Sequence, residues 1–214
     1  MTRLRWLTAG ESHGPALTAV LEGMVSGLPL VAADIDADLA GRQRGCGRGG
    51  RLQIERDSVA ILGGVRGGET LGGPIALSIE NRDFASWSER MQAAPFAQPP
   101  EKMSRPRPGH ADLAGGQKFG RRDLRDVLER ASARETAARV ALGAVCRKLL
   151  GALGVRLRSY VVSIGPVRVQ ALDPHDDEAF ARAEASDVRC ADEGGAERMR
   201  EAILAAAHAG DTLG

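Results

Sequence analysis

Apolar and polar residues alternate along several short segments of the chain, with the two-residue period of half-buried strands. Glycine pairs at 63–64, 67–68 and 72–73 separate some of these segments and are typical of turns. The pattern therefore predicts strands at residues 3–9, 16–25, 59–62, 75–79 and 155–164.

One long stretch instead has apolar residues at helical spacing. Ala138, Leu142 and Val145 share one face of a predicted helix over residues 133–153, and the alanines of that face allow close packing. Shorter helices are predicted at residues 34–43 with Asp34 as N-cap, from Asp173-Pro174 onward, and at residues 196–209.

The order of these elements favours an α+β fold. Strands come in runs rather than in strict alternation with helices, which argues against a doubly wound parallel sheet. Residues 81–120 contain several prolines and are predicted to be mostly loop, and a loop of this length in a compact domain is usually functional. No repeat or linker divides the chain, so we expect a single domain over residues 1–214.

Composition excludes some classes of function. The chain has 29 basic and 28 acidic residues and a net charge of +1, so no global field attracts nucleic acid or a membrane. Its 3 cysteines, at positions 46, 146 and 190, are far apart, which argues against disulfides and against zinc. Because the chain has neither an apolar signal segment nor an apolar run of ~20 residues, we expect a soluble cytoplasmic protein without bound metal.

The first candidate for chemistry is the segment Gly10-Glu11-Ser12-His13-Gly14, which follows the first predicted strand. Its glycines let the backbone turn sharply and let a ligand approach. A histidine in this position can shuttle protons near neutral pH, and a solvated turn residue is the plain alternative.

The second candidate runs from Arg105 to His110. Pro106 and Pro108 restrict the backbone here, so Arg107 and His110 have little conformational entropy left to lose on binding a ligand. An ordinary basic surface loop is the alternative interpretation.

The third candidate is the start of the long helix. Ser132 and Glu135 have the spacing of a capping box, and Arg130 and Arg134 lie beside free backbone N–H groups that favour phosphate. The same residues also describe an ordinary capped helix.

Glycine and arginine dominate residues 42–51, which include Arg42 and Arg48. This segment follows a predicted helix rather than a strand, which excludes a dinucleotide-binding fingerprint. An RNA-binding loop is disfavoured, because aromatic residues that stack on bases make up only 3% of the chain.

Taken together, these segments resemble chorismate synthase, in the family's order and at its spacing. The likeness rests on Gly10 to Gly14 with Glu22-Gly23, on Asp38-Leu39 with Arg42 and Arg48, on Arg107 to Asp112, and on Arg130 to Thr136. Residues 210–214 are similar to a further segment of the family, Gly-Asp-Ser/Thr-x-Gly.

The resemblance implies a lyase of the shikimate pathway and of aromatic amino acid biosynthesis. Members convert 5-enolpyruvylshikimate 3-phosphate to chorismate and phosphate by an anti 1,4-elimination that requires reduced FMN, and bifunctional members use NADPH as reductant. By this resemblance, His13 protonates the departing phosphate and His110 lies by the pyrimidine edge of the flavin. The expected flavin-site residues are Arg130, Ala131 and Ser132. The expected contacts to substrate or NADP are Arg42, Arg48, Arg107 and Arg134.

The fold that the resemblance implies has antiparallel sheets packed on a helical layer, in a homotetramer. Some members have serine at the position of Ala131. The family's C-terminal half, with a further arginine and an aspartate linked to proton removal, has no counterpart here. We therefore expect a truncated chain, incomplete at the C-terminus, that does not make chorismate by itself. The alternatives are a non-catalytic fragment that binds phosphorylated ligands or a full-length partner, and a nucleic-acid-binding module.

Overall fold

The computed structural model describes residues 3–46 and 56–213. The chain divides into two compact units, Met1–Gly41 with Gln53–Gly154 and Arg42–Leu52 with Val155–Gly214. Each unit has its own cluster of buried apolar residues. The single domain expected from the sequence stays a prediction. Among the described residues, no helix combines the length and the apolar composition that crossing a membrane requires.

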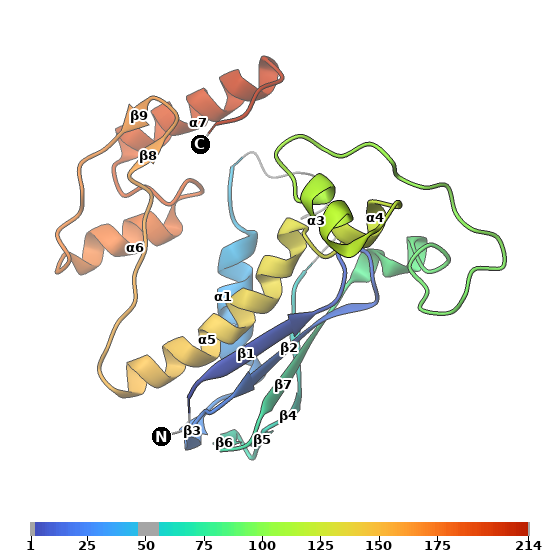
Figure 1. Cartoon of the computed structure of the whole chain (residues 1–214). Helices are drawn as coiled ribbons and strands as arrows, with labels where there is room; N and C mark the ends of the chain where they lie inside the picture. Colours follow the sequence, from blue (N-terminus) through green and yellow to red (C-terminus); the bar gives the residue numbers. More distant parts are fainter. Residues whose placement is uncertain (1–2, 47–55, 214) are drawn as a thin grey trace. The chain divides into compact units, whose positions relative to one another are not determined.

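A four-stranded antiparallel sheet in the order β1-β2-β7-β4 forms the centre of the first unit (Figure 1). Its strands are β1 (Arg5–Ala9), β2 (Ala16–Glu22), β4 (Val59–Gly63) and β7 (Ile75–Glu80). Alternate residues of β2 and β7 are buried, and Leu17 of β2 pairs with Ile79 of β7. Strands were therefore correctly predicted in all four places, although the two-residue period of burial is clear in β2 and β7 and absent from the mostly exposed β1.

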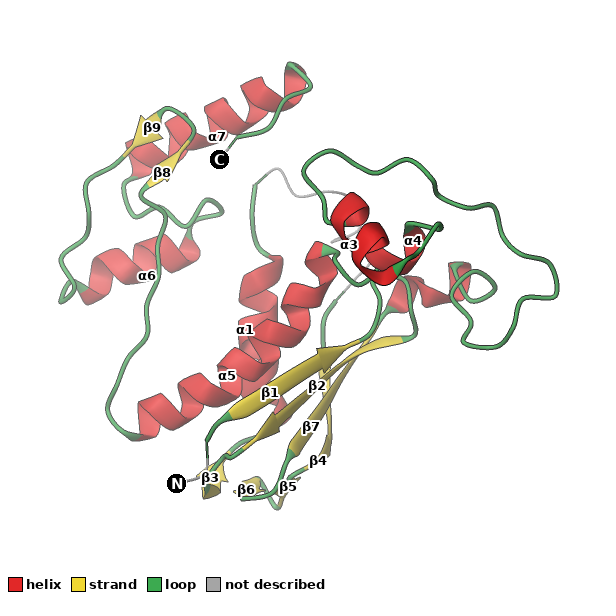
Figure 2. Ribbon diagram, viewed as in Figure 1, coloured by secondary structure: helices red, strands yellow, loops and turns green. Residues whose placement is uncertain are grey.

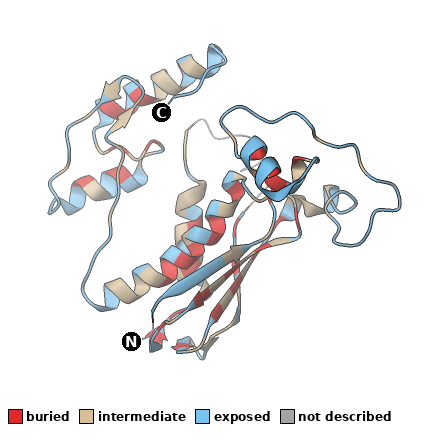
Figure 3. Cartoon of the chain, in the orientation of Figure 1, coloured by how far each residue is buried: buried red, intermediate tan, exposed pale blue. Residues whose placement is uncertain are grey.

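The predicted long helix is α5 (Thr136–Ala152), preceded by the 3-10 turn η2 (Ala133–Glu135). It packs along one face of the sheet, and its fully buried alanines allow the close approach (Figures 1 and 3). Helix α1 (Ala32–Gln43) adds Ile35 and Leu39 to the same core. Asp34 is not the N-cap of α1, because the helix begins two residues earlier. Its carboxylate accepts hydrogen bonds from the backbone N–H of Val31, just before the helix, and from Lys148 of α5.

The strand predicted over residues 16–25 ends early, at Glu22. Gly23 has φ +89°, so the chain turns there and continues as β3 (Ser26–Pro29). This strand joins β5 (Val65–Arg66) and β6 (Glu69–Leu71) in a separate sheet of order β3-β6-β5.

Residues 81–120 are mostly loop, as predicted, but a helix lies near each end of that range. The 3-10 helix η1 (Arg82–Ser86) begins it and α3 (Asp112–Phe119) ends it, with the long loop of Figure 2 between them. Two adjacent glycines weaken the helix signal of α3. Gly115 is required by packing, since a Cβ there would approach Val127 of α4 (Arg125–Leu128) to 2.3 Å.

The second unit contains two helices and a short hairpin. The hairpin pairs β8 (Ser163–Ile164) with β9 (Val167–Arg168), so the strand predicted over residues 155–164 is wrong for all but its last two residues. Alternation of apolar and polar residues shows which side chains could share a face, but it does not show that a neighbouring strand is present to form the backbone hydrogen bonds. The helices are α6 (Asp177–Ala185) and α7 (Glu193–His208), which begin at the N-caps Asp176 and Asp192 rather than at the predicted residues 173 and 196.

Candidate active site

The turn between β1 and β2 carries His13 and is shaped by Gly10. Gly10 has φ +101°, and a Cβ there would come within 2.4 Å of the first carbonyl oxygen of β2, so only glycine fits this turn. Asn81, buried directly after β7, donates from Nδ2 to the carbonyl groups of Glu11 and Gly14, at 3.0 and 2.8 Å. These contacts place His13 firmly beside the ends of the strands.

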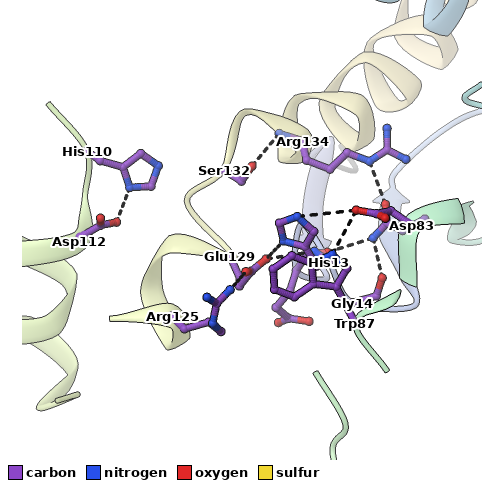
Figure 4. A network of polar contacts seen from close by, with 12 residues as sticks. His13, Gly14, Asp83, Trp87, His110, Asp112, Arg125, Glu129, Ser132 and Arg134 are labelled. Carbon is purple, nitrogen blue, oxygen red and sulfur yellow. Dashed lines mark hydrogen bonds and ion pairs between the residues drawn. The ribbon is translucent and has the colours of Figure 1, made fainter. Parts of the chain in front are cut away.

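Glu129, the residue after α4, binds the turn at several atoms. Its Oε2 accepts a hydrogen bond from the backbone N–H of His13 at 3.0 Å and lies 2.7 Å from Nδ1 of the imidazole. Its backbone carbonyl accepts from the N–H of Ser12 at 2.9 Å. Glu129 is only 2% exposed, so its carboxylate is buried against the histidine (Figure 4).

Arg125 and Trp87 complete a closed ring of contacts with this pair. Arg125 Nη1 donates to the other carboxylate oxygen of Glu129 at 2.9 Å, and its guanidinium carbon lies 5.1 Å from the centre of the Trp87 ring. Trp87 stacks on His13, with ring centres 4.0 Å apart and an interplanar angle of 30°. Asp83 accepts from the indole N–H at 3.2 Å and lies 4.0 Å from Nε2 of His13. A carboxylate therefore lies beside each nitrogen of the imidazole.

His110 forms a second histidine–carboxylate pair, within one short segment. Its Nδ1 bonds to Oδ1 of Asp112, whose Oδ2 accepts from the backbone N–H and from Nε of Arg107, both at 3.0 Å. Asp112 is fully buried at the start of α3. The Arg107 hydrogen bond is the largest influence on the pKa of Asp112 and, with the other donors, outweighs burial to hold it well below the usual range. The ionised carboxylate thus orients both Arg107 and His110.

The predicted flavin-site residues lie between α4 and η2. Arg130 Nη2 donates to the carbonyl oxygen and the hydroxyl of Thr8, at 2.8 and 2.6 Å, while its Nη1 is buried 3.6 Å from Glu135. Ala131 is exposed, and the hydroxyl of Ser132 accepts from a backbone N–H of η2 at 3.3 Å. The capping box forms only on the serine side, since Glu135 binds Thr8 and Arg139 instead.

Arg134 lies in the same helix start but points inward. Its guanidinium is buried, donates to Asn81 Oδ1 at 2.8 Å, and pairs with Asp57. Asn81 therefore joins Arg134 to the turn that carries His13.

Of the remaining predicted residues, Arg42 lies in the last turn of α1 and falls in the second unit. Arg48 lies outside the described residues, together with the rest of residues 47–51 of the glycine–arginine segment.

Sequence reasoning missed the residues that hold the predicted ones in place. They are Asn81, Trp87, Arg125 and Glu129. Glu129 directly precedes the Arg130 motif, but nothing in the spacing of the chain connects it with His13. Trp87 had one weak signal, as a large aromatic residue isolated in a polar segment.

The arrangement combines two kinds of chemical group. Histidines bonded to carboxylates can hold and release protons, and arginines bind anionic groups through paired N–H donors. Within residues 3–46 and 56–213, no group of three His, Cys, Asp or Glu residues is placed to hold a metal ion. The fold and these residues define an α+β protein with a candidate acid–base site suited to an anionic ligand.

Comparisons with known proteins agree with this class and narrow it. A family model described as chorismate synthase matches residues 4–214. The chorismate synthase of Rubrobacter xylanophilus is 57% identical over 213 residues, and that of Bacillus cytotoxicus is 52% identical over 217 residues. A solved structure described as "Crystal Structure of Chorismate Synthase" is 42% identical, with a TM-score of 0.77.

The chain belongs to the chorismate synthase family, a family of lyases. This confirms the resemblance and the α+β fold with antiparallel sheets packed on helices. The two sequence matches cover 99% of this chain but 54% and 56% of the relatives, and the solved structure is covered to 56%. The chain therefore spans about half the length of the relatives that it matches.

Proposed function

We propose that this chain carries part of the site at which 5-enolpyruvylshikimate 3-phosphate is converted to chorismate and phosphate, the last step of the shikimate pathway. Family membership across 99% of the chain supports this reaction. The structural observation that carries the proposal is His13, held at both its backbone N–H and its Nδ1 by the buried Glu129. A histidine held in this way is suited to deliver a proton to one fixed place.

In the proposed reaction, His13 is the catalytic acid. It gives a proton to the oxygen of the phosphate as the carbon–oxygen bond to the ring breaks, so the phosphate leaves with less negative charge. Arg42, Arg48, Arg107 and Arg134 are the proposed contacts for the anionic groups of the substrate. The buried guanidinium of Arg134 is engaged with Asp57 and Asn81, and the more exposed guanidinium of Arg107 is engaged with Asp112.

Reduced FMN is the proposed cofactor, and when bound it supplies the electronic step of the elimination. Arg130, Ala131 and Ser132 would hold it, and Arg130 brings a positive charge suited to an anionic group. In the part of the chain that the structure describes, its Nη1 makes no hydrogen bond but lies 3.6 Å from the Glu135 carboxylate, so it would exchange this ion pair for a contact with the cofactor. His110, oriented by Asp112, is proposed to lie beside the flavin ring.

Further properties are proposed from the family alone. NADPH would be the reductant if the protein reduces its own flavin. The assembly would be a homotetramer in the cytoplasm, with no nucleic acid or membrane partner.

The test uses a chimera in which the remainder of the Rubrobacter xylanophilus relative is fused after residue 214. We expect the chimera to form chorismate anaerobically with reduced FMN, and the 214-residue chain alone to serve as the matched comparison. A folded chimera that binds FMN without forming chorismate, beside an active intact relative, would overturn the proposal and favour a chain that only binds phosphorylated ligands.

A further inference from the structure

We propose that Glu129 is the positioning residue of His13: it keeps a proton on Nδ1, so that Nε2 is the atom at which the imidazole gains and gives up a proton. This inference rests on the proposed function for its catalytic meaning. The placement itself rests on the contacts of Glu129, which lie within the first unit.

Both carboxylate oxygens of Glu129 face hydrogen-bond donors. Arg125 donates to Oε1, and the backbone N–H of His13 donates to Oε2. A guanidinium and a backbone N–H can only donate, so the oxygen that each of them contacts accepts a hydrogen bond. The side chain of Glu129 is therefore an acceptor at both oxygens.

An acceptor at Nδ1 decides the tautomer of the imidazole. An ionised carboxylate has no proton to donate, so the 2.7 Å contact between Oε2 and Nδ1 requires the proton on the nitrogen. The neutral ring then has its lone pair on Nε2, and the protonated ring releases its proton from that atom. Glu129 selects which nitrogen takes part in proton transfer.

The same contacts fix the direction in which Nε2 points. Oε2 of Glu129 binds the main chain and the side chain of His13 together, which restricts the torsions between them. Trp87 stacks on the imidazole at 4.0 Å and fixes the plane of the ring. Arg125 lies over Trp87 and binds Glu129, so the four side chains support one another. A group held in this way loses little entropy when the reaction occurs.

The first test reads the tautomer directly and needs no activity. The chain has 4 histidines, so labelling with [15N]histidine gives few signals, and His13→Asn identifies those of His13. At a pH where the ring is neutral, we expect a protonated Nδ1 and an unprotonated Nε2 in the 214-residue chain, and loss of this pattern in Glu129→Ala. A wild-type ring with its proton on Nε2 would overturn the inference, whether or not any variant folds.

The second test measures turnover in the chimera with Rubrobacter xylanophilus. We expect Glu129→Ala to lower kcat by about 100-fold with little change in KM, and Glu129→Gln, which keeps one acceptor oxygen, to recover part of that loss. Asp126→Ala is the matched control, because this carboxylate is exposed on α4 and pairs with Arg121. It should leave kcat unchanged.

The outcomes separate the two proposals. Turnover by Glu129→Ala within about 2-fold of wild type would overturn the positioning role while leaving the proposed reaction in place. If Glu129→Ala does not fold, Glu129→Gln beside Asp126→Asn decides the question by the same comparison. A wild-type chimera without turnover would overturn the proposed function, and the imidazole measurement would still decide whether Glu129 holds Nδ1.

Discussion

The two histidine–carboxylate pairs, His13 with Glu129 and His110 with Asp112, consist of the same chemical groups but are brought together in different ways. In both, Nδ1 of the imidazole meets a buried carboxylate that also binds an arginine, Arg125 in one case and Arg107 in the other. His110 and Asp112 are 2 residues apart, whereas His13 and Glu129 are 116 residues apart. One pair is built by a local turn and the other by the packing of the whole first unit.

This difference in separation has thermodynamic consequences. Bringing together groups far apart in the chain costs loop-closure entropy, which increases with the logarithm of the loop length. The His13–Glu129 contact exists because the sheet and α4 fold around it, so it should be lost whenever that unit opens. The His110–Asp112 contact needs only the proline-stiffened segment before α3 and the start of that helix.

The surroundings of the two rings differ as well. His13 has an aromatic neighbour in Trp87 and a second carboxylate, Asp83, beyond Nε2. The ring of His110 lies instead against Arg107, whose side chain is 44% exposed. The two pairs are about equally enclosed, because the side chains of His13 and His110 are 20% and 25% exposed, so the difference lies in their neighbours.

The largest effect should come from removing each histidine in turn. In the chimera, His13→Ala and His110→Ala should each lower kcat by ~100- to 10,000-fold with little change in fold, because general acid–base groups contribute that much. Anaerobic assay of chorismate measures it, and circular dichroism checks the fold. Wild-type rates in both variants would contradict both assignments, whereas loss in only one would show which pair carries the chemistry.

The next effect concerns the local carboxylate. Asp112→Ala leaves the backbone N–H and the guanidinium of Arg107 without their buried acceptor, and should lower the free energy of unfolding by ~1–3 kcal/mol. Urea denaturation of the 214-residue chain measures it. The exposed Asp126, with its ion pair to Arg121, provides the control, and Asp126→Ala should change stability by less than ~0.5 kcal/mol. Equal losses of unfolding free energy in Asp112→Ala and Asp126→Ala would show that the buried contacts of Asp112 stabilise the chain no more than an exposed ion pair does.

Asp112 should also give the folded chain part of its sensitivity to acid. Because its pKa is lowered on folding, it contributes stability above the unfolded aspartate pKa of about 4, and this contribution is lost as the pH falls through the folded value. Wild type should therefore lose more unfolding free energy than Asp112→Asn between about pH 7 and about pH 3. The measurement is urea denaturation of both proteins across this pH range, and an equal loss of unfolding free energy in the two would contradict the prediction.

The smallest effect should come from the stacking that only the long-range pair has. A double-mutant cycle of Trp87→Leu with His13→Ala should give a coupling energy of ~0.5–1.5 kcal/mol in urea denaturation. Trp6, on β1, packs against Arg139 and serves as the control, with effects that add to those of His13→Ala. A coupling of zero for Trp87 would mean that the indole does not restrain the imidazole.

Much of the fold was readable from hydrophobic periodicity. Strands with one buried face and the alanine-rich helix α5 were predicted to within a few residues, because their periods follow from burial of one face. Helix α3 was missed because Gly115 and Gly116 lower helix propensity, and the close contact with Val127 requires glycine at position 115. The segment 155–162 was predicted as a strand because alternation does not reveal whether a pairing partner exists.

In the candidate site, too, the local features were predictable from the sequence and the long-range contacts were not. The sequence by itself determined the local chemistry, namely the glycine turn that presents His13 and the short segment in which Asp112 lies next to Arg107 and His110. Only the tertiary structure decided that Glu129 and Trp87 hold His13 and that Arg134 is buried on Asp57. Local contacts follow from backbone geometry over a few residues, whereas contacts across the chain depend on how the sheet and helices pack, which spacing along the sequence does not encode.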